Sequence, residues 1–358
     1  MVTPGRDGDG IRWLGPREIA PVVRGCRYLA WGEGALRFCR LPAQPIVRYP
    51  VDSWRRAHQS AGIRLEFTTD AGEWSLRLRH PSWEEGARTV VRVNGVERAI
   101  APAQREIDLR IAPGAGSVEV YLPPMAETEV AGIGLPEGAS FLPAGAAAIT
   151  WLAYGDSITQ GEGVSDGFHT YVEGVRRRLG LGSRLEVLNV GLSGAARGEY
   201  SVAEALAQMP CDLITVAMGT NVYGQGCYGG AAWREVLRNF LAVLRTGHPS
   251  TPLLVISPIW RAVDEAESTP NARGLTHRDL RRITEEVVLE RIQAGDSALT
   301  LVGGLELLGV GEPGLSGDGL HPNDSGADLI AERLTPAIRT LVERLLTRRG
   351  EEREGVGL

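Results

Sequence analysis

The stretch from Trp151 to Gly161 constrains the fold of this chain more than any other part of the sequence. Four residues typical of a buried strand run into Gly155-Asp156-Ser157, and a helix can begin directly afterwards. In an open α/β sheet, such a strand-to-helix turn lies at the carboxyl edge, where ligands bind. Backbone N–H groups at the start of the helix point to the same place and can hold developing negative charge. Ser157 is therefore a candidate nucleophile.

Two residues far downstream complete the chemistry that an activated serine needs. In Asp318-Gly-Leu-His321, a carboxylate three residues before a histidine can share one turn with it and orient its imidazole. Ser, His and Asp are the three parts of an activated nucleophile. The tripeptide Gly-Asp-Ser occurs a second time, at residues 295–297, but there it follows a helical pattern and precedes a strand pattern. That copy predicts a turn at the opposite edge of the sheet, without a catalytic role.

Two more motifs follow Ser157 in a fixed order. One strand pattern ends in Asn189-Val-Gly-Leu-Ser-Gly194, and another, which begins at Cys211, ends in Gly219-Thr-Asn221. With these four ordered blocks, the chain from about residue 148 to residue 345 resembles the SGNH, or GDSL-type, hydrolases. One departure is Val222, where many members of that family have a second polar residue.

The resemblance implies a role for each matching residue. Ser157 is expected to be the nucleophile, His321 the base, and Asp318 the acid that holds the imidazole. The oxyanion hole is expected to comprise the N–H groups of Ser157 and Gly194 and the side-chain amide of Asn221. The valine after Asn221 leaves this hole intact and removes one hydrogen bond that could support it.

The first part of the chain has a different pattern from the rest. Ile63–Thr68 and Trp74–His80 alternate apolar and polar residues, which is typical of half-buried antiparallel strands. Asn94-Gly95 marks a tight hairpin between two further strands. Short strands at regular spacing predict a β-sandwich of the jelly-roll kind, with Trp74 in its core.

The change of pattern sets the domain boundaries. We predict the β-sandwich at residues 1–135, a linker at 136–148, and a flexible tail at 348–358. Between them, from 149 to 347, strands alternate with helices. That alternation predicts a doubly wound parallel sheet, flavodoxin-like as in the SGNH hydrolase fold.

A sandwich in front of such a domain resembles a subgroup of the family that includes carbohydrate esterases and acyltransferases of natural products. Candidate substrate-binding residues are Asp156, Tyr223 and Trp260 in the second domain, and Trp83, in a predicted loop of the first. For Trp83, stacking on a substrate and a structural role are about equally favoured. The segments Tyr223–Gly230 and 261–276 both follow sheet strands, and we expect them to form mobile walls of the cleft.

Length and charge are those of a globular enzyme with more than one domain. The chain has 358 residues, which exceeds the size at which a single core usually keeps growing. A formal net charge of −6 argues against a general nucleic-acid binder. The absence of an apolar leader or a membrane-length segment predicts a cytoplasmic protein with no membrane partner. The sequence leaves the oligomeric state open.

No metal or cofactor is expected. The sequence has no HExxH motif and no cluster of histidines and carboxylates at metal-ligand spacing. The histidines apart from His321 are expected at polar surface positions: His58, His80, His169, His248 and His277.

Three functions stay open at this point. The first is a serine esterase or deacylase that cleaves a small ester, such as an acylated sugar or natural product, through an acyl-enzyme on Ser157. The second is an acyltransferase that moves an acyl group from a thioester to a hydroxyl of a sugar or natural product. The third is a non-catalytic carbohydrate-binding protein, which is disfavoured because both nucleophile and base are present.

Overall fold

A computed structural model describes residues 6–7, 10–32, 34–43, 49–262 and 268–355. The chain divides into two compact units, each with its own internal contacts. The first unit comprises Met1–Ala43, Ala57–Ala146 and Ser165–Phe168, and the second comprises Gln44–Arg56, Ala147–Val164 and His169–Leu358. The division therefore does not follow the order of the sequence alone, because one short segment from each half groups with the other half.

The first unit consists of two antiparallel sheets, with seven and six strands in the described residues. Such a pair of sheets around one core forms a β-sandwich. The first sheet contains β1 (Arg6–Asp7), β2 (Ile11–Leu14), β4 (Tyr28–Gly32), β5 (Ala35–Cys39), β7 (Trp74–Trp83), β10 (Glu106–Ile111) and β12 (Ala126–Pro136). The second contains β3 (Val23–Arg24), β6 (Arg64–Thr69), β8 (Arg88–Val93), β9 (Val96–Pro102), β11 (Gly116–Tyr121) and β13 (Leu142–Pro143). Two short helices lie near the start, α1 (Pro16–Ile19) and η1 (Ala20–Val22).

The alternating sequence explains how these sheets make a core. Along β7, the apolar residues Trp74, Leu76 and Leu78 are buried in the sandwich core, while the residues between them are more exposed. The predicted hairpin joins β8 and β9, and Asn94 and Gly95 have φ of +54° and +74°. These are the left-handed conformations that a tight two-residue turn needs. The β-sandwich is confirmed, whereas its jelly-roll connectivity stays a prediction.

The second unit is built on a parallel sheet whose described strands have the order β15-β14-β16-β17-β18. Their bounds are β14 (Ile149–Gly155), β15 (Leu185–Gly191), β16 (Leu213–Ala217), β17 (Leu253–Ile256) and β18 (Leu299–Val302). Numbered within this sheet, the order is 2-1-3-4-5, which is the flavodoxin-like order. The chain moves to one side of β14 and then to the other, so the carboxyl end of β14 lies at the switch point where ligands bind. The predicted fold class is confirmed.

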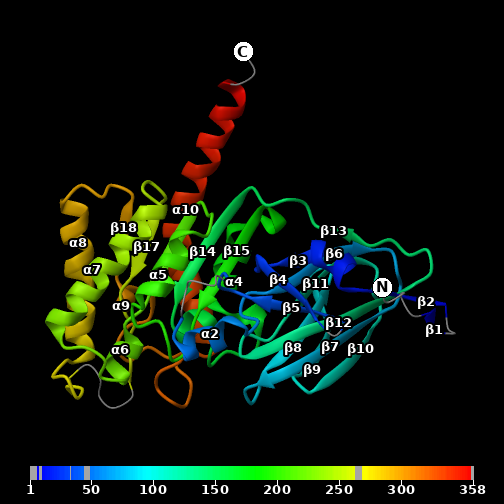
Figure 1. The fold of residues 1–358 in the computed structure, drawn as a ribbon, viewed down its shortest axis with the longest axis horizontal. Coiled ribbons are helices and arrows are strands. Elements are labelled where there is room, and N and C mark those ends of the chain that lie inside the picture. Colours follow the sequence, from blue (N-terminus) through cyan, green and yellow to red (C-terminus); the bar gives the residue numbers. More distant parts are fainter. Residues whose placement is uncertain (1–5, 8–9, 33, 44–48, 263–267, 356–358) are drawn as a thin grey trace. The chain divides into compact units, whose positions relative to one another are not determined.

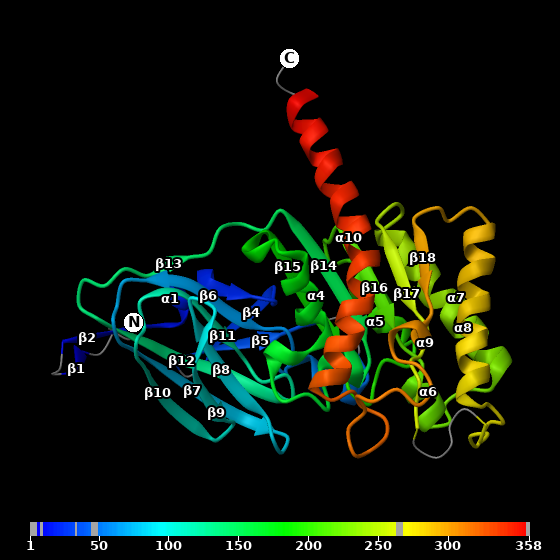
Figure 2. The ribbon, with the colours of Figure 1, turned by 180° about the vertical axis from the view of Figure 1, so that it is seen from behind.

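Helices cover both faces of this parallel sheet (Figures 1 and 2). On one face, α4 (Tyr171–Leu179) and α10 (Asp324–Gly355) share a core with Trp151. On the other, Tyr154 stacks on Phe240 of α7 (Gly230–Gly247), with ring centroids 5.1 Å apart. Next to α7 lie α5 (Tyr200–Ala207) and α8 (His277–Gln293). The shorter helices are α2 (Val51–Ala57), α3 (Ser157–Gln160), η2 (Gly167–His169), η3 (Gly182–Arg184), α6 (Thr220–Gly224) and α9 (Gly304–Leu307).

Three segments differ from what the sequence indicated. β7 continues to Trp83, where a loop was predicted, because β12 pairs with it that far. Strand β13 lies inside the predicted linker, 136–148, and pairs with β6. Helix α10 continues to Gly355, through most of the predicted tail, and residues 356–358 lie outside the described residues. Local composition did not reveal these three segments. The first two depend on pairing with strands that are distant in the sequence.

Candidate active site

Ser157 is the first residue of α3, directly after the turn that follows β14. The side chain of Asp156 accepts a hydrogen bond from the Ile158 N–H at 3.1 Å and so caps α3. Only glycine fits at position 155, because a Cβ there would lie 2.6 Å from the carbonyl oxygen of Ala217. Since β14 lies between β15 and β16, this turn holds Ser157 at the carboxyl edge of the sheet, at the switch point.

The three residues predicted as a triad form one chain of hydrogen bonds. The Oγ of Ser157 lies 2.8 Å from Nε2 of His321, and Nδ1 of His321 lies 2.6 Å from Oδ2 of Asp318. With Nδ1–H donating to the carboxylate, Nε2 has the lone pair that can accept the serine proton. The other carboxylate oxygen, Oδ1, accepts from the N–H groups of Leu320 and His321, which folds 318–321 into one turn. Ser157 and His321 are both buried.

Asp318 is held in its ionised form. Partial burial acts to raise the pKa of its carboxyl, but the backbone N–H groups of His321 and Leu320 and the His321 imidazole outweigh that effect. The net result is a pKa below the ordinary value for aspartate. Asp318 therefore presents a negative charge at neutral pH and can stabilise a positive charge on the His321 imidazole.

Each of the predicted oxyanion donors has an N–H hydrogen without an acceptor among the described residues. The N–H groups of Ser157 and Gly194 have no hydrogen-bond partner in the part of the chain that the structure describes. Gly194 has φ of +67°, a left-handed conformation that glycine adopts without strain. The side-chain amide of Asn221 donates one hydrogen to the carbonyl oxygen of Ala195. Its second hydrogen has no partner among the described residues, so Asn221 can brace this loop and still act as a donor.

A second carboxylate, which was not predicted, lies beside the imidazole. Oε2 of Glu162 is 3.6 Å from Nε2 of His321 and accepts a 2.5 Å hydrogen bond from Oγ of Ser193. Glu162 stands between Gly161 and Gly163, which have φ of +105° and +92°, in a tight turn directly after α3. The sequence shows a glutamate five residues after the serine, but nothing in it sets the direction of that side chain.

The loop that carries Gly194 is supported by residues from far upstream. Nε of Arg56, on α2, donates to the carbonyl oxygen of Ser193 at 3.1 Å. Asp52, also on α2, forms a 2.5 Å ion pair with Arg197. Both belong to Gln44–Arg56, which groups with the second unit. No sequence motif marks this support, and it was not predicted.

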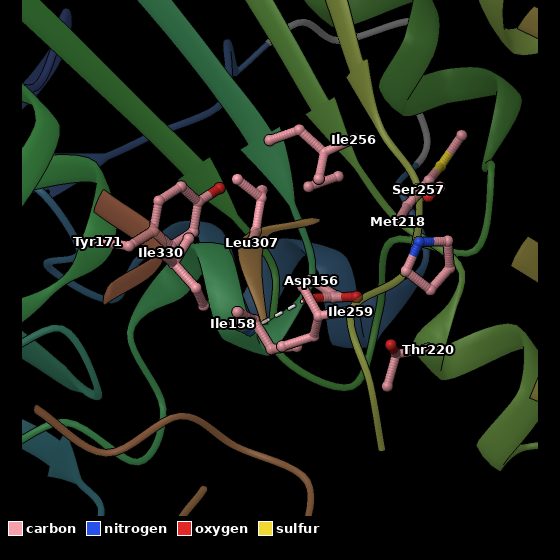
Figure 3. A pocket seen from close by; sticks show the side chains of 12 residues that line it. Asp156, Ile158, Tyr171, Met218, Thr220, Ile256, Ser257, Ile259, Leu307 and Ile330 are labelled. Atoms are coloured by element: carbon pink, nitrogen blue, oxygen red, sulfur yellow. Dashed lines mark hydrogen bonds between the residues drawn. The ribbon is translucent and has the colours of Figure 1, made fainter. Parts of the chain in front are cut away.

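Next to the turn that holds Ser157 lies a small cavity of about 30 Å³ (Figure 3). Asp156 is one of its lining residues, and most of the others are apolar, such as Met218 and Ile256. Burial in these surroundings raises the pKa of Asp156 to about 6, against the capping hydrogen bond from Ile158, which acts to lower it. Asp156 was predicted to bind substrate. Its side chain is 4% exposed, and the described contact of its carboxylate is the helix cap.

Tyr223 lies at the end of the Gly219-x-Asn221 block and is buried on α6. Its hydroxyl donates to the carbonyl oxygen of Thr269 at 2.9 Å, and the side-chain amide of Asn271 donates to its carbonyl oxygen at 3.1 Å. The two segments predicted to wall the cleft therefore contact one another. Their mobility stays a prediction, and residues 263–267 of the second segment lie outside the described residues.

The two candidate tryptophans lie in different surroundings. Trp260 follows β17 in the second unit, is half-buried, and donates its backbone N–H to the carbonyl oxygen of Leu308 at 3.1 Å. Trp83 belongs to the first unit, and 45% of its surface is exposed at the end of β7. Stacking of Trp83 on a substrate stays a prediction, whereas Trp74 is buried in the core as predicted.

The surface expectation is wrong for three histidines, His80, His248 and His277, which are all buried. Each contacts a polar partner: for example, Nε2 of His248 lies 3.0 Å from the carbonyl oxygen of Leu206. The described residues contain no group of three or more His, Cys, Asp or Glu side chains that could hold a metal ion. None of the described helices is both long and apolar enough for a membrane span.

The order of the motifs and the geometry of the site agree with one known family. Residues 153–329 match the GDSL-like lipase/acylhydrolase family. This segment belongs to that family. The GDSL domain therefore comprises most of the second unit, and the protein is a serine enzyme of the SGNH type.

Solved structures of other proteins share the fold of nearly the whole chain. The salicylyl-acyltransferase SsfX3 from a tetracycline biosynthetic pathway has a TM-score of 0.78 at 23% identity, over 96% of this chain and 99% of that one. A putative GDSL-like lipase from Bacteroides ovatus has a TM-score of 0.75 at 22% identity, over 93% and 98%. A family two carbohydrate esterase from Cellvibrio japonicus has 0.64 at 16%, over 93% and 98%. No curated protein matches the sequence.

Proposed function

We propose that the protein cleaves a small ester, such as an acylated sugar or natural product, through an acyl-enzyme on Ser157. The observation that carries the proposal is the continuous relay from Ser157 through His321 to Asp318, with hydrogen bonds of 2.8 and 2.6 Å. This relay lies at the carboxyl end of β14, which is the ligand-binding edge of a flavodoxin-like sheet. Nucleophile, base and orienting acid are thus assembled where a substrate can reach them.

The first half-reaction follows from these contacts. Nε2 of His321 takes the proton of Ser157 as Oγ attacks the acyl carbonyl, and Asp318 stabilises the resulting imidazolium. The imidazolium then gives its proton to the leaving oxygen, and the acyl group stays on Oγ. In the second half-reaction, a nucleophile loses its proton to Nε2, attacks the acyl carbon and releases Ser157.

Negative charge on the acyl oxygen would be held by three donors. These are the N–H groups of Ser157 and Gly194, which have no partner among the described residues, and the second amide hydrogen of Asn221. Removing one such donor typically lowers kcat by ~10²–10³.

A second candidate is transfer of the acyl group to a hydroxyl acceptor. It is supported by the likeness to the salicylyl-acyltransferase, which covers 96% of this chain. The relay serves both reactions equally, because they differ only in the nucleophile that resolves the acyl-enzyme. The non-catalytic alternative is disfavoured by the assembled nucleophile and base.

Two assays test these functions. Incubation with p-nitrophenyl acetate should release p-nitrophenol in a burst and add an acetyl group to the peptide that contains Ser157, measured by mass spectrometry. A lack of both would exclude acyl-enzyme chemistry for short esters. Incubation of the wild-type protein with an acyl thioester and a set of alcohols then distinguishes an esterase, which releases the free acid, from an acyltransferase, which forms a new ester.

A further inference from the structure

The imidazole of His321 has carboxylates at both of its nitrogens. Asp318 lies 2.6 Å from Nδ1, and Glu162 lies 3.6 Å from Nε2, on the side of the ring that contacts Ser157. The mechanism proposed above uses Asp318 and leaves Glu162 without a role. A charged side chain at 3.6 Å from the atom that exchanges protons needs an explanation.

The position of Glu162 is fixed from several sides. Its N–H donates to the carbonyl oxygen of Ser157 at 2.9 Å, and its Oε2 accepts the 2.5 Å hydrogen bond from Ser193. The next residue, Gly163, packs against the base itself, because a Cβ there would lie 2.7 Å from Cβ of His321. The turn that carries Glu162 is therefore fitted between nucleophile and base.

The carboxylate also keeps a free side. Its second oxygen, Oε1, has no hydrogen-bond partner in the described part of the chain, and 31% of the side chain is exposed. A ligand can therefore reach Glu162. The other oxygen, Oε2, accepts the hydrogen bond from the Ser193 hydroxyl, and this bond holds the carboxylate in one orientation.

We propose that Glu162 binds the nucleophile that resolves the acyl-enzyme and selects nucleophiles that carry a second hydrogen-bond donor. The inference rests on the proposed function, because it requires an acyl group on Ser157. The resolving oxygen must lie within hydrogen-bond reach of Nε2 of His321, and Glu162 lies beside that same atom. One donor of the nucleophile then binds Nε2, and the other binds Glu162.

The step balances without any further reactant. The reacting O–H gives its proton to Nε2, its oxygen forms a bond to the acyl carbon, and the bond from the acyl carbon to Oγ of Ser157 breaks. The proton then passes from Nε2 to Oγ. Throughout, Glu162 accepts a hydrogen bond from the second donor, which fixes the direction of attack.

This arrangement defines a class of acceptor. Water has two donors on one oxygen, and a vicinal diol or a sugar has a second hydroxyl next to the reacting one. Each of them can satisfy His321 and Glu162 together. A monohydric alcohol leaves Oε1 of Glu162 without a donor in a partly buried site, which is costly. The site is therefore suited to water and polyhydroxylated acceptors, and poorly suited to simple alcohols.

The test is a competition between ethylene glycol and ethanol for the acyl-enzyme formed from p-nitrophenyl acetate. The ratio of hydroxyethyl acetate to ethyl acetate is measured at equal alcohol concentrations and is independent of how fast the acyl-enzyme forms. Wild-type protein should favour the diol well beyond the factor of about two that its two hydroxyls supply. In Glu162→Ala the ratio should fall by roughly tenfold to a hundredfold, the usual value of a hydrogen bond to a charged group.

Three further variants sharpen the result. Glu162→Gln keeps the shape and one acceptor but removes the charge, so its ratio should lie between those of wild type and Glu162→Ala. Ser193→Ala, which frees the carboxylate to reorient, should lower the ratio more mildly. Glu204→Ala is the matched control, because it removes a glutamate of α5 that has no described side-chain contact, and its ratio should equal that of wild type.

The outcomes distinguish this inference from the function on which it rests. A normal p-nitrophenol burst in Glu162→Ala and Glu162→Gln with an unchanged product ratio would overturn the role of Glu162 alone. A wild-type protein that acquires no acetyl group on Ser157 would overturn the proposed function, and the inference with it.

Discussion

Nε2 of His321 lies 2.8 Å from Oγ of Ser157, although 164 residues separate them in the sequence. Ser157 is held by the turn after β14, and His321 by the turn that Asp318 closes shortly before α10. The contact therefore depends on how the sheet and α10 are packed together. It is also the contact on which the chemistry of the protein is expected to depend most.

Replacement of Ser157 or His321 should abolish turnover without unfolding the protein. We expect Ser157→Ala and His321→Ala each to lower kcat for p-nitrophenyl acetate by at least ~10³-fold, and the double variant to be little worse, because the two act as one unit. Thermal unfolding should be close to that of wild type. Ser297→Ala, in the turn between α8 and β18, is the control and should be fully active. Full activity in Ser157→Ala would point to a different nucleophile.

Asp318→Asn should lower kcat by roughly 10²–10⁴-fold, since it removes the charge that stabilises the imidazolium and disturbs the tautomer of His321. It should also change how stability depends on pH. The folded-state pKa of Asp318 is lowered, so its stabilising contribution is present above the ordinary carboxyl pKa and is lost as pH falls through the folded-state value. The difference in unfolding free energy between wild type and variant should therefore shrink in acid. Equal differences at pH 3 and pH 7, measured by urea unfolding, would contradict this.

Asp156 should have the opposite effect on stability, because its folded-state pKa is raised from 3.8 to about 6. Between these values the folded protein binds more protons than the unfolded chain, so stability falls as pH rises from about 4 to 6. This rise in pKa corresponds to about 3 kcal/mol of lost stability at neutral pH. Asp156→Asn keeps an oxygen that can cap α3 and removes the charge, so it should stabilise the protein more at pH 8 than at pH 4.

Urea unfolding of wild type and Asp156→Asn at both pH values tests this prediction. Asp52→Asn is a useful comparison, because it removes a carboxylate that is paired with Arg197 and so should destabilise. If Asp156→Asn is destabilised equally at pH 4 and pH 8, the cap requires a carboxylate and burial is not the dominant effect.

Asn221→Ala should lower kcat for p-nitrophenyl acetate by ~10²–10³ with a much smaller change in KM, as expected for a donor that acts on the oxyanion. The substitution also removes the hydrogen bond to the Ala195 carbonyl, so its effect on folding must be measured by thermal unfolding. Gln225→Ala is the matched control, because Gln225 also supports this loop, by donating to the carbonyl oxygen of Gly194 at 2.7 Å, and is not one of the predicted oxyanion donors. A loss of equal size in both variants would indicate that loop support, and not charge stabilisation, is the role of Asn221.

The parts of the fold with local signals were predictable. Helix α4 has such signals at both ends, because the Thr170 side chain caps its start by accepting a hydrogen bond from the Glu173 N–H and Gly180 ends it with φ of +71°. The position of Ser157 was also predictable. A strand-to-helix turn in a parallel sheet leaves few choices for where the first helical residue can lie.

Features that depend on distant partners were not predictable. Arg56 contacts Ser193 across 137 residues of sequence, and no composition or spacing marks that pair. The burial of His248 could not be predicted for the same reason, since its partner is the Leu206 carbonyl oxygen, which comes from α5. Glu162 lies close to Ser157 in sequence, but the direction of its side chain is set by Ser193.

Most of helix α2 belongs to the second unit, although its sequence lies within that of the first. The two units therefore cannot be exchanged by a single cut in the sequence. A gene fragment that begins at the linker would encode β14 to α10 and all three residues of the relay, and it would look complete by its motifs. It would nevertheless lack Asp52 and Arg56, and with them two of the contacts that hold the loop of Gly194. Fusions and domain exchanges in this protein should therefore keep residues 49–56 with the second unit, although they are encoded before most of the sandwich.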